Sequence, residues 1–437
     1  MTGKAKKPTP LATSTTGTTR RSFLQTALAG GAFGTAYLAI GSNMYAKAAG
    51  PITIGHQAEL TGGFSSWGYW HDKCAQKAAA IINEGGGIGG RELRVVTDDT
   101  ESNPAAGARK LRSLIQRKGA SFVTGSVHSG VMLASIPVAT ELKTVYFSCG
   151  EATEATGSKG SRYAFRTGND TYTLSGAGAP WAYENLGKNW TMIFPDYAWG
   201  HSHHKEHKRV IEELGGKVND PIAVPLDSRD LVPYLAKVPE ETEVLFSVFF
   251  GALSVAFYTQ AKNMGLGEKM KMYSVSGTIE AIAPADIDGA AEGVYFLENF
   301  PRPLAAKDDE YHKEFIKVME IDPVNGREAT SDRVIAKSHA WQPWENLFLL
   351  KAAIEASGWK GKKDDQGVIE YLEGAKMSNS LAHPQGDKIL RAEDHSGILD
   401  NYISQVRGGV FETIKRIPKE EINEKLPPRF DFTKTAL

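Results

Sequence analysis

Short apolar runs alternate with longer amphipathic stretches along the chain from Pro51 onward. The apolar runs have the length of buried strands, and the stretches between them repeat apolar residues at helical spacing. This alternation is typical of βαβ units, in which helices cover a parallel sheet. The expected strands are residues 52–58, 92–99, 121–126, 144–149, 191–196, 244–250, 271–276 and 293–298. The expected helices are residues 70–83, 104–118, 130–142, 173–186, 203–214, 231–238, 253–264, 309–319, 339–357 and 364–374.

These elements fall into two successive groups rather than one long sheet. A chain of 437 residues exceeds one ordinary core, so two domains are expected. We therefore predict an α/β protein with two doubly wound lobes. Ligands of such folds bind beyond the carboxyl ends of the strands, so a functional site is expected in the loops that follow the strands.

The first 48 residues have the features of an export signal. A basic start is followed by TTRRSFLQ at residues 18–25, an apolar glycine-rich run at 26–40, and the small-x-small cleavage site AKA at 46–48. Twin arginines before a mildly apolar run are typical of a Tat signal. A transmembrane helix or a chance arginine pair is the alternative, but the run is short and broken by glycine. We predict a periplasmic mature protein that begins at Ala49 and crosses the membrane already folded.

The formal net charge of the whole chain, −1, hides an acidic mature protein. All of the charged residues before the cleavage site are basic, so processing removes positive charge and no negative charge. A nucleic-acid partner therefore has no electrostatic support. The basic residues removed would be Lys4, Lys6, Lys7, Arg20, Arg21 and Lys47.

Two cysteines would survive processing into an oxidising compartment. Cys74 lies in a predicted helix and Cys149 at a strand end. They could pair if the fold brought them together, and two free, buried thiols are the alternative.

Residues 85–90 read GGGIGG and match the dinucleotide-binding pattern G-x-G-x-x-G. The segment follows a predicted helix and precedes a predicted strand. A dinucleotide site needs the opposite order, because the phosphate must meet a helix N-terminus. We predict a flexible turn from helix to strand, and no cofactor is expected.

The sequence HHKEH at residues 203–207 matches an inverted zinc-protease pattern. On a helix His203 and His207 would share a face, with Glu206 beside them. A third ligand cannot be nominated, and the neighbouring lysines suit a solvated helix face. A metal site is therefore the minor interpretation, and a solvated helix is the main one.

Seven segments carry a family pattern. They are LTGGFSSWG (60–68), AAAIINEGGGIGGRELRVVTDDTESNP (78–104), SFVTGSVHSGVMLASIPVA (121–139), YAFRTGND (163–170), FPDYAWG (194–200), AAEGVYF (290–296) and RAEDHSGILDNYISQV (391–406). In this order they resemble the leucine/isoleucine/valine-binding type of periplasmic solute-binding protein, which serves ABC importers. The resemblance implies two Rossmann-like lobes joined by a three-segment hinge, with a ligand closed into the cleft between them. The expected division is a signal peptide (1–48), lobe 1 (49–170 and 299–395) and lobe 2 (171–298 and 396–437).

Lobe 1 gathers polar donors at the start of a predicted helix. Ser126, His128 and Ser129 precede the helix that begins at Gly130, and the free amides and dipole of that helix favour a carboxylate. Ser129 matches the carboxylate-binding serine of the family, which implies that it holds the acidic group of a ligand together with His128. A plain helix N-cap is the alternative role for its hydroxyl, and both roles can coexist.

The resemblance also implies aromatic walls. Trp67 falls where the family places a pocket aromatic, Trp199 matches a second one from lobe 2 with Tyr197 beside it, and Phe250 falls near a third. Such residues can close over an apolar ligand and bury it. The alternative for each is a position in a core.

The first departure from the family lies in the loop after the strand at 144–149. The family uses a threonine there to hold an α-carboxylate, but Ala152 takes its place and Thr153 comes one step late. Gly150 and Glu151 complete this loop and are included in the predicted site.

The second departure concerns the acid that would pair with an α-ammonium. It aligns near Ser276 and Gly277, and Glu280 follows only later. A buried ammonium without a carboxylate is costly, so either Glu151 or Glu280 supplies the charge or the ligand has no ammonium. A branched-chain or hydrophobic amino acid and an aromatic or aliphatic organic acid both stay open.

The sequence thus predicts a non-enzymatic binding protein that closes on a small carboxylate-containing ligand and delivers it to the membrane permease of an ABC importer. A monomer suits that role. The alternatives are a ligand-sensing receptor protein of the same fold and a secreted zinc enzyme built on His203, Glu206 and His207.

Overall fold

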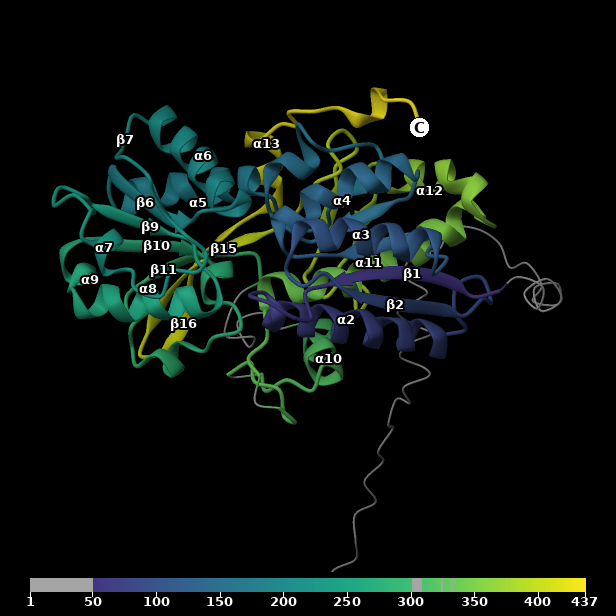
Figure 1. Ribbon diagram of the computed structural model, residues 1–437, viewed down its shortest axis with the longest axis horizontal. Helices are drawn as coiled ribbons and strands as arrows, with labels where there is room; N and C mark the ends of the chain where they lie inside the picture. The colour runs from purple at the N-terminus through teal and green to yellow at the C-terminus, as the bar shows by residue number, and fades with distance from the viewer. Residues whose placement is uncertain (1–49, 301–308, 324, 332) are drawn as a thin grey trace, which may run out of the picture. The chain divides into compact units, whose positions relative to one another are not determined.

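Two separate parallel-dominated sheets organise the chain (Figure 1). The computed structural model describes residues 50–300, 309–323, 325–331 and 333–437. The first sheet has five parallel strands in the order β2-β1-β3-β4-β5, and we call it and its helices lobe 1. Its strands are β1 (Ile52–Ala58), β2 (Leu93–Asp99), β3 (Phe122–Gly125), β4 (Tyr146–Ser148) and β5 (Ala164–Phe165).

The strand order of lobe 1 explains where its helices lie. The chain moves from β1 to the neighbouring β2 in one direction and then across β1 to β3 in the other. Because such crossovers are right-handed, α2 (Ser65–Glu84) covers one face of the sheet, and α3 (Pro104–Gln116) and α4 (Ser129–Glu141) cover the other. The later helix α11 (Lys337–Ser357) packs against α2.

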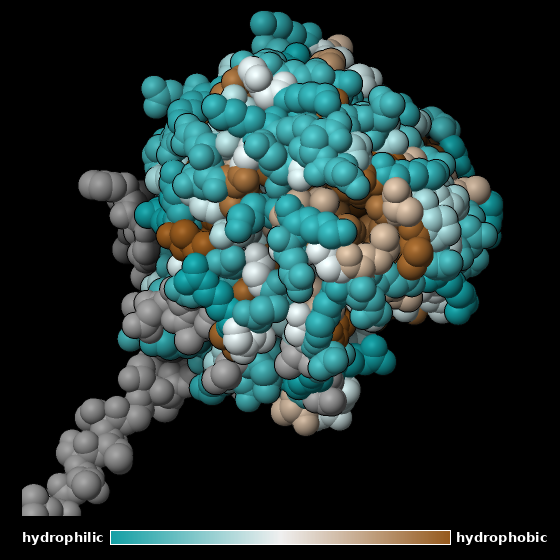
Figure 2. Space-filling model, turned by 90° about the vertical axis from the view of Figure 1, so that its left-hand side faces the viewer, coloured by the Kyte–Doolittle hydropathy of each residue, from teal (hydrophilic) through white to brown (hydrophobic). Residues whose placement is uncertain are grey.

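The second sheet has eight strands in the order β16-β15-β11-β10-β9-β6-β7, with β8 beside β6, and defines lobe 2. Its core contains Phe249, Phe257, Tyr258 and Phe296. The surface at this end of the molecule is mostly hydrophilic, with scattered apolar patches (Figure 2). The strands are β6 (Asn189–Pro195), β7 (Lys217–Val218), β8 (Ile222–Val224), β9 (Val244–Ser247), β10 (Lys271–Val275), β11 (Tyr295–Glu298), β15 (Asn401–Arg407) and β16 (Val410–Ile417). The helices are α5 (Thr171–Asn185), α6 (Ala198–Glu213), α7 (Val232–Leu235), α8 (Gly251–Asn263) and α9 (Leu266–Lys269).

The remaining elements follow β11 or the last strand. A small antiparallel sheet of three strands joins lobe 1 through a bridge between Arg166 and Ser396. Its strands are β12 (Lys376–Met377), β13 (Lys388–Leu390) and β14 (Gly397–Ile398), and the helices are α10 (Glu310–Val318), α12 (Asp365–Leu372) and α13 (Lys419–Lys425).

The α/β class is confirmed, and every expected strand and helix has a counterpart. Two helix starts were predicted wrongly, because α2 begins at Ser65 and α6 at Ala198. A glycine lies in the first turn of each of these helices. Both positions require glycine for close packing and do not end the helix. A Cβ at Gly68 would lie 2.0 Å from the Glu59 carbonyl oxygen, and a Cβ at Gly200 would lie 2.2 Å from the Pro195 carbonyl oxygen.

The antiparallel hairpin of β15 and β16 was not predicted. Gly408 and Gly409 both have positive φ, +58° and +76°, and form its two-residue turn. A glycine pair between alternating apolar residues is the usual hairpin signal, so the pattern was present in the sequence.

The glycine-rich segment and the two cysteines can now be compared with their predictions. GGGIGG is the turn between α2 and β2, as predicted, and four of its glycines have positive φ. Cys74 and Cys149 are free and buried, and burial raises the pKa of both thiols.

The predicted export signal lies outside the described residues, and the residue boundaries of the lobes stay a prediction. In the described part of the chain, no helix has the length and apolar character needed to cross a membrane.

Candidate ligand-binding pocket

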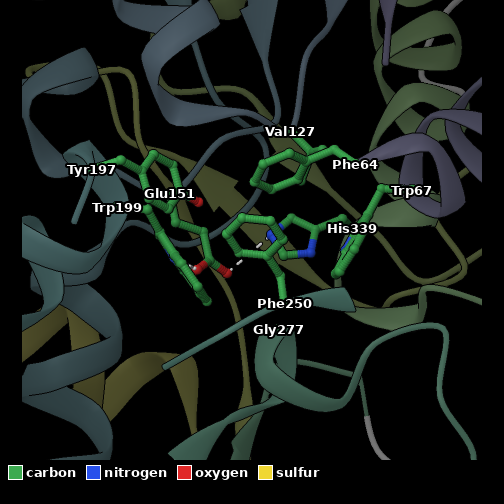
Figure 3. Close-up of a pocket in the computed structure, with 9 residues that line it drawn as sticks. All are labelled: Phe64, Trp67, Val127, Glu151, Tyr197, Trp199, Phe250, Gly277 and His339. Carbon is green, nitrogen blue, oxygen red and sulfur yellow. Dashed lines mark hydrogen bonds and ion pairs between the residues drawn. The ribbon is translucent and has the colours of Figure 1, made fainter. Parts of the chain in front are cut away.

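A small pocket, partly open to solvent, lies where loops of the two sheets meet (Figure 3). Six of its residues follow the carboxyl ends of β1, β3, β4, β6, β9 and β10, the position at which doubly wound sheets bind ligands. The pocket is lined by Phe64, Trp67, Val127, Glu151, Tyr197, Trp199, Phe250, Gly277 and His339.

Aromatic rings from both lobes form most of the walls. Phe64 of lobe 1 stacks on Phe250 of lobe 2, with 4.1 Å between ring centroids. Trp67 and Tyr197 meet Phe250 edge to face at 6.3 Å and 5.7 Å. Phe64, Tyr197 and Phe250 occupy the N-cap positions of α2, α6 and α8, so the helix starts fix where these rings lie.

Glu151 is the acidic residue of the pocket, and its side chain is only 4% exposed. Trp199 donates its indole N–H to Oε2 at 2.7 Å, and His339 contacts Oε1 through Nε2 at 3.1 Å (Figure 3). His203 Nε2 lies 3.4 Å from Oε2. Trp199 and His203 belong to α6 of lobe 2, whereas Glu151 follows β4 of lobe 1. One carboxylate therefore bridges the two lobes.

The Glu151 and His339 side chains shift each other's pKa in opposite directions. Burial alone would raise the pKa of Glu151, but the charge of His339 and the hydrogen bonds from His203 and His339 bring it well below its usual value. Burial would lower the pKa of His339, but Glu151 and, to a smaller extent, Glu280 raise it. The arrangement favours an ion pair in the wall of the pocket.

Glu280 lies behind this pair and is not part of the pocket wall. Both of its carboxylate oxygens accept the backbone N–H of Ser338 at 3.1 Å. Ser338 Oγ in turn lies 2.7 Å from His339 Nδ1. The position of the His339 ring is therefore fixed on both of its nitrogens.

The start of α4 is built differently from the prediction. His128, not Ser129, is the N-cap, because its Nδ1 accepts the N–H of Val131 at 3.2 Å. Burial lowers the pKa of His128 to about 4, which keeps the ring neutral near pH 7. Ser129 is buried, its Oγ accepts the N–H of Ala152 at 3.3 Å, and it does not line the pocket.

Only Glu151 of the loop at residues 150–153 reaches the pocket wall. Gly150 packs against Ser129, where a Cβ would lie 3.3 Å from the serine Cα. Thr153 points to the start of α5, with its Oγ1 2.6 Å from Thr171 Oγ1. Buried Arg166 holds the loop from behind by donating to the carbonyl oxygens of Gly150 at 2.8 Å and Ala152 at 3.2 Å.

The three residues of the zinc-protease pattern point to different partners. Glu206 accepts from Arg209 at 3.1 Å and from Arg429 at 2.8 Å. His207 stacks on Phe246 at 4.1 Å, and His203 faces Glu151. All three are buried, so the expected solvated face was wrong. Among the described residues, His, Cys, Asp and Glu side chains form no group of three or more that could hold a metal ion.

A family model for periplasmic binding proteins matches residues 51–410, which is most of the chain. The protein belongs to this family. Members and structural neighbours are solute-binding proteins, so the α/β fold with two lobes observed here is the type I periplasmic binding protein fold.

Curated relatives of this periplasmic binding protein are distant. Leu/Ile/Val-binding protein homolog 6 of Brucella suis is 22% identical over 339 residues, which cover 75% of this chain and 81% of the relative. Leu/Ile/Val-binding protein homolog 1 of Brucella abortus is 25% identical over 207 residues, covering 47% and 54%.

Solved structures show the same fold at similar distance. A solute-binding protein of an ABC transporter from R. palustris, in complex with benzoate, has a TM-score of 0.72 and 20% identity, covering 84% of this chain and 97% of its own. The leucine binding protein LivK of Thermotoga maritima has a TM-score of 0.70 and 21% identity, covering 85% and 99%. A third, from R. palustris in complex with 4-hydroxybenzoate, has a TM-score of 0.73 and 18% identity, covering 86% and 100%.

The pocket of this periplasmic binding protein contains part of the predicted site. Ser276 opens the short helix η2 (Ser276–Ile279) beside Gly277. Phe64, Val127 and His339 were missed. Phe64 follows two glycines in the loop after β1, a usable signal, whereas His339 lies 188 positions after Glu151 and no local pattern marks it. The predicted residues that line the pocket are Trp67, Glu151, Tyr197, Trp199, Phe250 and Gly277, and those outside it are His128, Ser129, Gly150, Ala152, Thr153 and Glu280. Their roles in binding stay a prediction.

Proposed function

We propose that this periplasmic binding protein is the solute-binding component of an ABC importer. It captures a small organic molecule between its lobes and presents the closed form to a membrane permease. The observation that supports this most is the pocket itself, whose walls come from both lobes. A ligand held there contacts both lobes at once and favours the closed form over the open one.

The pocket walls favour a small ligand with an apolar or aromatic body. The sequence resemblance implies that the ligand also carries a carboxylate. Hydrophobic amino acids and aromatic or aliphatic organic acids both meet this description. Leucine, benzoate and 4-hydroxybenzoate, which appear in the names of three structural neighbours, belong to two of these classes: hydrophobic amino acids and aromatic acids.

The protein reaches its place of action by export. Residues 1–48 direct Tat export, and the mature chain from Ala49 works in the periplasm as a monomer. It acts by binding and release, not by catalysis.

A thermal-shift screen of the mature chain tests the proposal. A ligand that binds only the folded state raises the melting temperature, and at one hundred times its Kd it adds about 2.7 kcal/mol to the free energy of unfolding. The screen contains hydrophobic amino acids, aromatic carboxylates, aliphatic acids and small amines. At least one class should stabilise the wild type, and the stabilisation should shrink in Trp67→Ala. If no class stabilises the protein, the proposed function is wrong.

A further inference from the structure

The charge of the pocket differs from what an acidic ligand needs. Within the described part of the chain, none of the nine lining residues is an arginine or a lysine, whereas Glu151 is buried in the wall and ionised. Arg166 lies behind the loop and donates to backbone oxygens, and its charge interacts with four carboxylates, those of Asp170, Glu151, Asp394 and Glu154. A ligand carboxylate would therefore meet the negative charge of Glu151, whose positive partner in the wall, His339, is already paired with it.

Two donors in the pocket wall are already used by Glu151. The indole N–H of Trp199 and the His339 ring both bond its oxygens, at 2.7 Å and 3.1 Å. Trp199 lies in the first turn of α6, near the positive end of that helix dipole. Ser129, the expected carboxylate ligand, is outside the pocket wall and bonded to Ala152. The Glu151 carboxylate thus takes hydrogen bonds that a ligand carboxylate would otherwise accept.

Aromatic rings surround the same carboxylate. Trp67, Tyr197, Trp199, Phe64 and Phe250 line the space beside Glu151 (Figure 3). Ring faces attract a cation and do not attract an anion, and desolvation strengthens the attraction. A cluster of rings around one carboxylate is the arrangement that recognises ammonium groups.

The His339 side chain balances the charge of Glu151. Its ring faces Glu151 on one side and Ser338 on the other, with Glu280 and His71 close enough to influence its charge. A cation that approaches Glu151 competes with the proton of His339. It does not have to displace a permanently charged lysine or arginine.

We infer that the ligand is a small organic cation, an amine or a quaternary ammonium, whose charged nitrogen lies against Glu151 between the aromatic rings. This inference rests on the proposed function and replaces the carboxylate expected from the resemblance. It makes Glu151 the residue that determines ligand charge.

The decisive experiment compares ligands that differ only in charge. Binding of choline and of 3,3-dimethylbutan-1-ol, its uncharged carbon analogue, is measured by isothermal titration calorimetry on the wild-type mature chain, with benzoate and leucine in parallel. Choline should bind at least about tenfold more tightly than the uncharged analogue, because the ring faces and Glu151 both act on the charge. Equal binding of the two would overturn the inference, and so would binding of benzoate or leucine without binding of choline.

A matched pair of variants locates the effect. Glu151→Gln should lose at least about tenfold in choline affinity, while Glu154→Gln, three residues along the same segment, should keep it. Circular dichroism of Glu151→Gln checks that it folds, and the comparison of ligands on the wild type decides the matter if it does not. Stabilisation by benzoate or leucine with no effect of cations leaves the proposed function standing and rejects the inference. Failure of every class of compound rejects both.

Discussion

The carboxylate of Glu151 lies where three elements meet, because it follows β4 and its partners come from α6 and α11. A buried carboxylate is stable only when its oxygens are hydrogen-bonded and its charge is paired. Trp199, His203 and His339 meet both needs here. Each of these contacts can be removed by a conservative substitution, so the energetics of the site can be tested one atom at a time.

Trp199→Phe removes the indole donor and keeps an aromatic ring in the wall. A hydrogen bond to a charged group contributes about 1.5–3 kcal/mol, so the free energy of unfolding should fall by about 2 kcal/mol. Urea denaturation followed by tryptophan fluorescence measures this. Trp181→Phe is the control, because Trp181 lies on α5 against Tyr295 and should cost much less. Equal losses in the two variants would show that the bond to Glu151 contributes little.

The pKa of His339 leads to a pH-dependent contribution to stability. Because it is raised above 6.5 in the folded chain, the stabilisation is complete below pH 6.5 and is lost as the pH rises through the folded value. Buried His71, His128 and His207 have lowered pKa values and act in the opposite direction, so the difference between wild type and His339→Gln is the informative quantity. That difference in unfolding free energy should shrink as the pH rises above 6.5.

The control for this measurement is His201→Gln, an exposed histidine next to Asp196 at the start of α6. Its ion pair is exposed and should contribute little to the unfolding free energy, so the difference from wild type should be small. On the acid side, Glu151 contributes stability above its unfolded pKa of about 4.3, and that part is lost as the pH falls through its lower folded value. A flat difference for His339→Gln from pH 6 to 9 would contradict the ion pair.

At the scale of elements, the start of α2 positions Trp67 and depends on the neighbouring glycine. Gly68→Ala would place a methyl group 2.0 Å from the Glu59 carbonyl oxygen, and backbone on both sides must move to relieve it. Such overpacking costs about 1–3 kcal/mol or more. The melting temperature and the ligand affinity should both fall. Gly85→Ala, at the other end of α2, meets its nearest atom at 3.4 Å and should leave both nearly unchanged.

The strands of the two sheets could be predicted because buried parallel strands are short apolar runs with few other interpretations. Helix starts at the pocket could not, because Gly68 and Gly200 are there for close packing and not to end a helix. The same distinction explains the site. Trp199 was found through the family resemblance and Glu151 through its place in the loop after a predicted strand. His339 reaches the pocket only through the packing of α11 on α2, which depends on the assembled fold.

At the scale of the whole molecule, the stack of Phe64 on Phe250 and the bond from Trp199 to Glu151 are contacts between the lobes. Contacts of this kind set the ratio of closed to open molecules before a ligand arrives. Weakening them lowers the affinity, because part of the binding energy is then used to close the lobes.

Phe250→Ala tests this coupling, since it removes the stack with Phe64 and leaves Glu151 in place. An aromatic pair contributes about 0.5–1.5 kcal/mol beyond the area it buries, which corresponds to a roughly two- to tenfold change in the ratio of closed to open molecules. Small-angle X-ray scattering should give a larger radius of gyration for the ligand-free variant than for the ligand-free wild type, and a saturating ligand should bring the two values together. Phe430→Ala, a substitution at an exposed phenylalanine, should behave as wild type. If the variant keeps the wild-type radius with and without ligand, the stack does not control closure, and the aromatic walls act on the ligand alone.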